Sequence, residues 1–217
     1  MHENRSAKSY STRFFKDWAQ AKIMDTFVKI CGLSEREHVL AAIEAGADAL
    51  GFVFVDSVRK VSIDKAINIS QDTDGRIKRV AVFYKPELSD WTKVIEEFKP
   101  DVVQTDSSDF SFLSVPDAIE KWPVYRENQE NMQFPSEKIF LYEGKRSGKG
   151  ELVDWDKAAN YSKNRKMILA GGLSHLNVSE AITKVRPFGV DVSSAVEASP
   201  GKKDITLIEK FIKNAKE

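Results

Sequence analysis

The chain has 217 residues, and its 33 basic and 33 acidic side chains give a formal net charge of zero. Such a chain has no overall field to attract nucleic acid or an anionic membrane, so we expect neither partner. Hydrophobic residues make up 41% of the sequence, which argues against disorder, and no apolar run approaches the roughly 20 residues that span a bilayer. The single cysteine, Cys31, can form no internal disulfide, and the sequence has no signal-peptide pattern. We therefore predict a cytoplasmic enzyme or binding domain.

Residues 1–26 differ from the rest of the chain because they are polar, mildly basic and without a strand pattern. The stretch 11–23 has the spacing of a short helix with Phe14, Phe15 and Trp18 on one side, which would suit an arm that packs on the body or on a partner. We favour a frayed tail. Met24 directly precedes the first strand, so residues 1–23 are a candidate extension upstream of the natural start.

From Phe27 onward, short runs rich in Val, Ile and Phe alternate with amphipathic stretches. Continuous apolar runs such as LGFVFV are typical of strands buried on both faces, as in parallel sheets. Eight strands are predicted, at Phe27–Cys31, Ala49–Phe54, Arg79–Phe83, Val102–Gln104, Val124–Arg126, Ile139–Tyr142, Met167–Ala170 and Val190–Val192. Six helices are predicted between and after them, at Glu35–Glu44, Ile63–Gln71, Leu88–Phe98, Trp155–Lys163, Val178–Val185 and Asp204–Ala215. Their predicted N-caps include Ser34, Ser62 and Asn177.

Eight strands in strict alternation with helices indicate an α/β fold, a single compact (β/α)8 TIM barrel over residues 27–217 that follows the 1–26 extension. No linker rich in Gly, Ser or Pro interrupts the alternation, which argues against two domains. The connections around Pro116–Trp122 and Asn128–Glu137 are too short or too polar for full helices. We therefore expect the fourth and fifth helices to be reduced.

Glycine and serine pairs follow the last two predicted strands. Gly171 and Gly172 come after the seventh strand, and Ser193 and Ser194 come after the eighth. Adjacent glycines let the backbone approach a ligand closely and turn N–H groups toward it, and the serines add hydroxyl donors. The loops after strands seven and eight are the usual phosphate site of this fold. The four residues therefore predict a phosphate site.

Other reactive side chains stand at the ends of further strands. Cys31 ends the first strand, where a thiol with a lowered pKa would serve as nucleophile or base, although most free cysteines are simply small buried hydrophobes. Arg59 is placed to clamp a carboxylate or to remain solvated. Glu143 follows the sixth strand and Asp191 the eighth, so a carboxylic acid across the mouth from Cys31 would complete an acid–base pair. The loop 144–150 is a candidate lid.

A metal site has little support in the sequence. The histidines His2, His38 and His175 do not form a spaced set with Cys31, which argues against a zinc site and against a Cys–His dyad. We expect neither a metal nor another cofactor.

Several motifs, in order along the chain, resemble those of the phosphoribosylanthranilate isomerase family, barrel enzymes of tryptophan biosynthesis. They are KICGL (29–33), GADALGFVF (46–54), SVRKVS (57–62), ILAGGL (168–173) and VDVSSAVEASPGKKD (190–204). The resemblance extends from Val28 to about Ala215 and excludes the tail. It implies a phosphorylated small-molecule substrate and an Amadori rearrangement of N-(5-phosphoribosyl)anthranilate.

The resemblance also implies roles for the residues at the strand ends. Cys31 would be the general base and Glu143 the general acid. Arg59 would bind the anthranilate carboxylate, and Asp191 would contact the sugar. The phosphate would be held by the glycine and serine pairs, Gly171, Gly172, Ser193 and Ser194.

Three positions depart from the family pattern. The family's acid is usually an aspartate in an L-L-D pattern, where this chain has L-Y-E with Glu143. The usual Q-L-H-G is Gln104-Thr105-Asp106-Ser107 here, without the histidine. Ala195 replaces a glycine, which would be strained only at a positive φ.

Two other functions are compatible with the sequence. One is the histidine-pathway aldose–ketose isomerase, which normally has two phosphate sites and a pair of aspartates. The other is a non-catalytic barrel that binds a phosphosugar. The sequence is compatible with a monomer or a homodimer.

Overall fold

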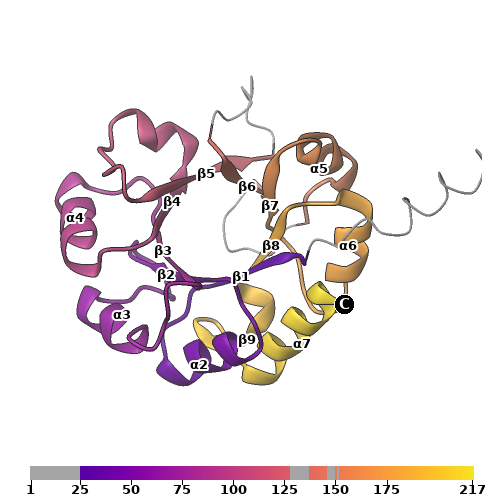
Figure 1. Ribbon diagram of the computed structural model, residues 1–217, viewed down its shortest axis with the longest axis horizontal. Helices are drawn as coiled ribbons and strands as arrows, with labels where there is room; N and C mark the ends of the chain where they lie inside the picture. The colour runs from indigo at the N-terminus through magenta and orange to yellow at the C-terminus, as the bar shows by residue number, and fades with distance from the viewer. Residues whose placement is uncertain (1–24, 128–136, 146–149, 151) are drawn as a thin grey trace, which may run out of the picture.

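Eight parallel strands occupy the centre of the molecule and close into a barrel in their order along the chain (Figure 1). The computed structural model describes residues 25–127, 137–145, 150 and 152–217. The strands are β1 (Phe27–Cys31), β2 (Ala49–Val53), β3 (Lys78–Val82), β4 (Val102–Asp106), β5 (Glu120–Arg126), β6 (Ile139–Glu143), β7 (Lys166–Leu169) and β8 (Gly189–Val192). Because β8 pairs with β1, the ring is complete. The predicted (β/α)8 barrel is confirmed.

Helices surround this barrel and shield its outer face (Figure 1). They are α2 (Arg36–Glu44), α3 (Ile63–Ile69), α4 (Leu88–Lys93), α5 (Trp155–Ser162), α6 (Val178–Val185) and α7 (Ile205–Lys216). After β4 a short 3-10 helix, η3 (Ser107–Ser111), replaces a full α-helix, as predicted. The connection after β5 lies mostly outside the described residues, and so does the tail. Within the described part of the chain, no helix is both long and apolar enough to cross a bilayer.

Some local features differ from the sequence predictions. The single helix predicted at Leu88–Phe98 continues after Lys93 as a π-helical turn, η2 (Val94–Phe98). Strand β5 begins at Glu120 rather than at Val124, because residues 120–124 pair with β4. The hairpin of β9 (Glu197–Ser199) and β10 (Lys202–Lys203) was not predicted, since strands this short carry no periodic pattern. A short 3-10 helix, η4 (Ser194–Val196), precedes it.

The three predicted N-caps have different outcomes. Ser62 is confirmed, because its hydroxyl accepts the Lys65 N–H at 3.2 Å. The cap at Ser34 is wrong: α2 begins later, at Arg36, and the Ser34 hydroxyl donates to the Gly201 carbonyl at 3.4 Å. Asn177 does precede α6, but its side chain accepts the Ser174 N–H and donates to the Gly172 carbonyl instead of capping the helix.

The interior of the barrel changes from apolar to polar along the strands. Side chains alternate between the two faces of a strand, so inward positions recur every second residue. On β4, Val102 lies in the apolar interior, whereas Gln104 and Asp106 further along line a cavity. On β6, Leu141 and Glu143 repeat this change. The apolar interior contains Ala49, Val80, Val102, Trp122, Val124, Leu141 and Ile168.

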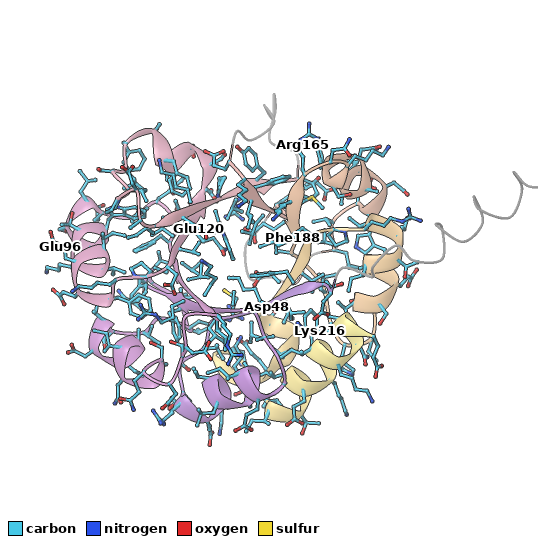
Figure 2. The ribbon with its side chains drawn as sticks, in the orientation of Figure 1. Asp48, Glu96, Glu120, Arg165, Phe188 and Lys216 are labelled. Carbon is cyan, nitrogen blue, oxygen red and sulfur yellow. The ribbon has the colours of Figure 1, made fainter. Side chains whose placement is uncertain are left out.

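The last helix is fastened to the beginning of the barrel. Asp48, just before β2, accepts a hydrogen bond from the Val28 N–H at 2.8 Å and forms an ion pair with Lys216 at 3.1 Å. Figure 2 shows Asp48 and Lys216 near one another. The end of α7 is thereby held against the start of the first two strands.

The close contact of β8 with β1 generates a stability prediction. An added Cβ at Gly189 would lie 2.6 Å from the Phe27 carbonyl oxygen, so Gly189→Ala must displace backbone. We expect the free energy of unfolding, measured by urea titration, to fall by about 1–3 kcal/mol. Gly75 has no atom within 4 Å of an added Cβ, so Gly75→Ala is the control. Equal stability of the two variants would contradict the packing argument.

Candidate active site

A cavity of about 550 Å³ opens at the carboxyl ends of the strands. Its walls come from segments far apart in the sequence, from β1 to the loop after β8. All eight residues singled out from the sequence line it: Cys31, Arg59, Glu143, Gly171, Gly172, Asp191, Ser193 and Ser194. The structure thus brings every predicted site residue to one cavity, at the end of the barrel where this fold places its active sites.

The thiol of Cys31 lies deep in this cavity, only 7% exposed. Burial raises its pKa above the ordinary value, although the charges of Lys29 and Lys203 oppose that effect. A thiol that acts as base needs a lowered pKa, so the direction found here is the reverse of the one expected from the sequence. Beside the thiol, Lys29 donates to the Asp191 carboxylate at 2.8 Å in a buried ion pair.

The glycine and serine pairs form one wall of the cavity. Gly171 and Gly172 have φ values of 89° and 66°, which favour glycine. An added Cβ at Gly172 would also lie 2.8 Å from the backbone nitrogen of Leu152. Ser193 donates its hydroxyl to the Cys31 carbonyl at 3.1 Å, which joins this wall to β1. Ala195 lies in η4 and is not among the residues with positive φ, so replacing glycine there causes no strain.

Arg59 belongs to a network of charges that the sequence analysis did not find. Its Nε and Nη2 donate to the two carboxylate oxygens of Glu197 at 2.6 and 2.9 Å. Glu197 also accepts from Lys203, whose fully buried ammonium donates in addition to the Ser193 carbonyl. Although burial opposes it, hydrogen bonds from Arg59 and Lys203 hold the pKa of Glu197 below its ordinary value. The network fixes the guanidinium and the serine wall in one arrangement.

A second missed residue, Arg126 at the end of β5, joins two carboxylates at the mouth. Its Nη1 donates to Glu143. Its Nη2 and Nε donate to Asp106 at 2.6 and 3.1 Å. Asp106 stands in the segment where the family's histidine is absent, so this chain has a guanidinium between two carboxylates there. The signal was present in the sequence, because Arg126 ends a predicted strand.

Gln104 offers a polar group to a ligand. It is 6% exposed, lines the cavity, and its Oε1 has no hydrogen-bond partner within the described part of the chain. A buried carbonyl oxygen without a partner costs free energy, and a hydroxyl or N–H of a bound ligand would remove that cost.

Two other predictions concern metals and the lid. Among the described residues, no group of three or more His, Cys, Asp or Glu side chains is arranged to hold a metal ion. The candidate lid, residues 144–150, lies mostly outside the described residues. Its described members Gly144, Lys145 and Gly150 line the cavity.

The fold and the cavity define the class: a TIM-barrel enzyme whose cavity presents a thiol, carboxylates and an arginine at the carboxyl ends of the strands. The family model described as N-(5'phosphoribosyl)anthranilate (PRA) isomerase matches residues 28–214. The N-(5'-phosphoribosyl)anthranilate isomerase of Listeria welshimeri is 39% identical over 204 residues, 87% of this chain and 98% of the relative. The chain therefore belongs to the N-(5'-phosphoribosyl)anthranilate isomerase family.

Solved structures agree with this assignment. A crystal structure of phosphoribosyl anthranilate isomerase in complex with reduced 1-(o-carboxyphenylamino)-1-deoxyribulose 5-phosphate is 33% identical, with a TM-score of 0.73, and the match covers 88% of this chain and 98% of that one. A structure of monomers generated from the dimeric enzyme of Thermotoga maritima is also 33% identical, with a TM-score of 0.70 and the same coverage.

The Glu197 network generates a pH-dependent prediction. Glu197→Gln leaves the buried Lys203 without a carboxylate, so we expect the free energy of unfolding at neutral pH to fall by about 1–3 kcal/mol. Because the pKa of Glu197 is lowered in the folded chain, its ion pairs stabilise the fold at pH values above the ordinary pKa of 4.5. That stabilisation is lost as the pH falls through the folded pKa.

Urea unfolding across the acidic range measures this effect. The difference between Glu197→Gln and the wild type should shrink in acid. Glu96→Gln, on an exposed position of η2, is the control and should leave stability unchanged (Figure 2). A Glu197→Gln effect of equal size at every pH would contradict the charged network.

Proposed function

We propose that this chain isomerises N-(5-phosphoribosyl)anthranilate to 1-(2-carboxyphenylamino)-1-deoxyribulose 5-phosphate, with Cys31 as general base and Glu143 as general acid. The observation that carries the proposal is the gathering of all eight predicted site residues in one cavity of a chain of this family. The solved relative that binds a reduced form of the product supports the same reaction. Such a reaction belongs to tryptophan biosynthesis, and we propose a cytoplasmic enzyme.

The reaction begins with two proton transfers. Protonated Glu143 donates to the furanose ring oxygen as the bond from that oxygen to C1 breaks, and the anthranilate nitrogen supplies the electron pair that forms a Schiff base. The Cys31 thiolate then removes the proton from C2, which gives an enolamine. Return of a proton from the Cys31 thiol to C1 and loss of the C2 hydroxyl proton to the Glu143 carboxylate give the ketone and restore both groups. Each proton-transfer group contributes roughly 10²–10⁴-fold to the rate.

Arg126 pairs with the proposed acid, Glu143, and also with Asp106. A carboxylate that is paired with a guanidinium resists protonation. Because Asp106 accepts from two nitrogens of the same guanidinium, Arg126 keeps a carboxylate partner when Glu143 takes up its proton. The guanidinium is therefore not left without a carboxylate when Glu143 carries the proton that the proposed mechanism requires.

The substrate is an anion at both ends, and the cavity offers a different group for each. We assign the phosphate to the wall of Gly171, Gly172, Ser193 and Ser194, because these four residues line the cavity together and offer backbone N–H groups and hydroxyls as donor types. We assign the anthranilate carboxylate to Arg59, because Glu197 already fixes its orientation. Asp191 faces the sugar between them.

Both alternative functions have less support. The histidine-pathway isomerase normally uses a pair of aspartates, whereas the family match here and the thiol at Cys31 favour the anthranilate substrate. A non-catalytic barrel would bind phosphosugars without turnover, so the activity assay below separates it from the proposed enzyme. A monomer or a homodimer stays a prediction for this chain.

The base assignment is tested with Cys31→Ser. A serine hydroxyl ionises far less readily than a thiol, so we expect kcat to fall by roughly 10²–10⁴-fold. Consumption of the substrate is followed by the change in anthranilate fluorescence. His175 does not line the cavity, and His175→Asn is the control that should keep its activity. Near wild-type kcat in Cys31→Ser would overturn the assignment.

The carboxylate clamp is tested with Arg59→Lys. Lysine cannot hold Glu197 and a substrate carboxylate with the planar geometry of a guanidinium. We expect KM to rise about 10–100-fold, as for the loss of one charged hydrogen bond, with a smaller change in kcat. Arg36→Lys, at an exposed ion pair with Asp72, is the matched control. An unchanged KM would assign the carboxylate to another group.

A further inference from the structure

A lysine points into the barrel directly below the candidate base. Lys29 and Cys31 are two residues apart on β1, so both face the interior. Strand β8 is the neighbour of β1 in the barrel (Figure 1), and on it Asp191 is in register with Lys29. Lys29 is completely buried, and its ammonium donates to Asp191 at 2.8 Å. Cys31, Lys29 and Asp191 therefore form one cluster at the floor of the cavity.

Gly51 on β2 has no side chain, and the Lys29 ammonium and the Cys31 thiol both border the space that this leaves. An added Cβ at Gly51 would lie 2.9 Å from the Cys31 sulfur and 3.2 Å from the Lys29 nitrogen. Both atoms thus border the same point, and any side chain on Gly51 would have to separate or displace them. The lack of a side chain permits the ammonium to approach the sulfur.

The fold alone does not require a charge at this place. Burying an ammonium costs several kcal/mol even when it is paired, and apolar pairs of similar volume often serve stability equally well. Apolar side chains fill the interior beneath the cavity, including Ala49, Val80 and Ile168. A buried lysine among them is therefore expected to act on its neighbours in the cavity.

The charges that face the thiol come from four segments. Lys29 lies on the same strand, Asp191 on β8, Lys203 on β10, and Arg59 in the loop after β2. Lys203 and Arg59 are both paired with Glu197. Among the described cations, only Lys29 lies within ion-pair distance of Asp191. Lys29 is also the cation that most opposes the effect of burial on the pKa of Cys31.

We propose that Lys29 is a positioning residue for the isomerisation: its buried ammonium stabilises the thiolate of Cys31 and holds the Asp191 carboxylate toward the sugar. The inference rests on the proposed role of Cys31 as base. Lys29 carries its own proton throughout. Although burial lowers its pKa, the charges of Asp191 and Cys31 raise it above the usual value. The proton from C2 is therefore taken by the sulfur, and the Lys29–Asp191 pair remains neutral overall when the thiol is protonated.

The test compares two variants that avoid an unpaired buried carboxylate. Asp191→Asn keeps the Lys29 side chain beside the thiol, and the double variant Lys29→Met with Asp191→Asn removes it. Cys31 is the only cysteine of the chain, so the rate of alkylation by iodoacetamide as a function of pH reports this thiol alone. We expect the profile of the double variant to lie at least one pH unit above that of Asp191→Asn, which corresponds to about tenfold slower alkylation at neutral pH.

Controls separate this effect from a structural one. Lys78→Met removes a lysine that pairs with Glu120 at the start of the strands, and it should leave the alkylation profile unchanged. Circular dichroism checks that each variant is folded. Coincident profiles of Asp191→Asn and the double variant would overturn the role of Lys29.

A second measurement tests the same inference without any substitution. In wild-type protein with isotope-labelled lysine, the Lys29 resonance should shift in step with the ultraviolet absorbance of the thiolate as the pH rises. A Lys29 resonance whose position does not change as the thiol ionises would overturn the inference. Alkylation requires no substrate, so its outcome is independent of turnover. Full activity in Cys31→Ser would refute the base role, whereas unchanged alkylation would refute the role of Lys29.

Discussion

The closing of the parallel sheet on itself is the constraint from which the site follows. Once β8 pairs with β1, every second side chain of eight strands must share one narrow interior. Apolar residues fill its lower part, and the last inward position of several strands is left to face a cavity. Thiol, carboxylate and guanidinium groups from distant parts of the sequence meet there because each is the last inward residue of its strand or follows it.

Buried charge in this cavity is organised around carboxylates. Glu197 holds Arg59 and Lys203, Asp191 holds Lys29, and the guanidinium of Arg126 lies between Asp106 and Glu143. A buried ion is costly unless it has a partner, so each of these contacts fixes its members in place. An enzyme that moves protons within a bound substrate gains from such rigidity, because its acid and base need not be reoriented during the reaction.

Much of this arrangement could be predicted from the sequence, since it depends on local pattern. Continuous apolar runs marked the strands, and a position at or just after the end of a strand marked Cys31, Glu143 and Ser193 as neighbours in the cavity. The partners of the charges could not be predicted, because the pairing of Arg59 with Glu197 joins residues 138 positions apart. Arg126 ends a predicted strand, but its pairing with Asp106 and Glu143 could not be predicted for the same reason. The pKa of Cys31 depends on burial, which the sequence does not reveal.

The two ends of the barrel body meet on the side away from the cavity. Asp25, just before β1, lies 3.5 Å from Lys216 at the end of α7, and Lys216 also reaches Asp48 at the start of β2. Joining these ends needs only a short linker, and it would leave the ligand-facing end of the barrel untouched. Chains whose ends lie close together tolerate circular permutation and fusion well. The same geometry makes this barrel a suitable unit for building bifunctional chains, because a partner can be attached at the end of the barrel opposite the cavity and leaves the cavity entrance open.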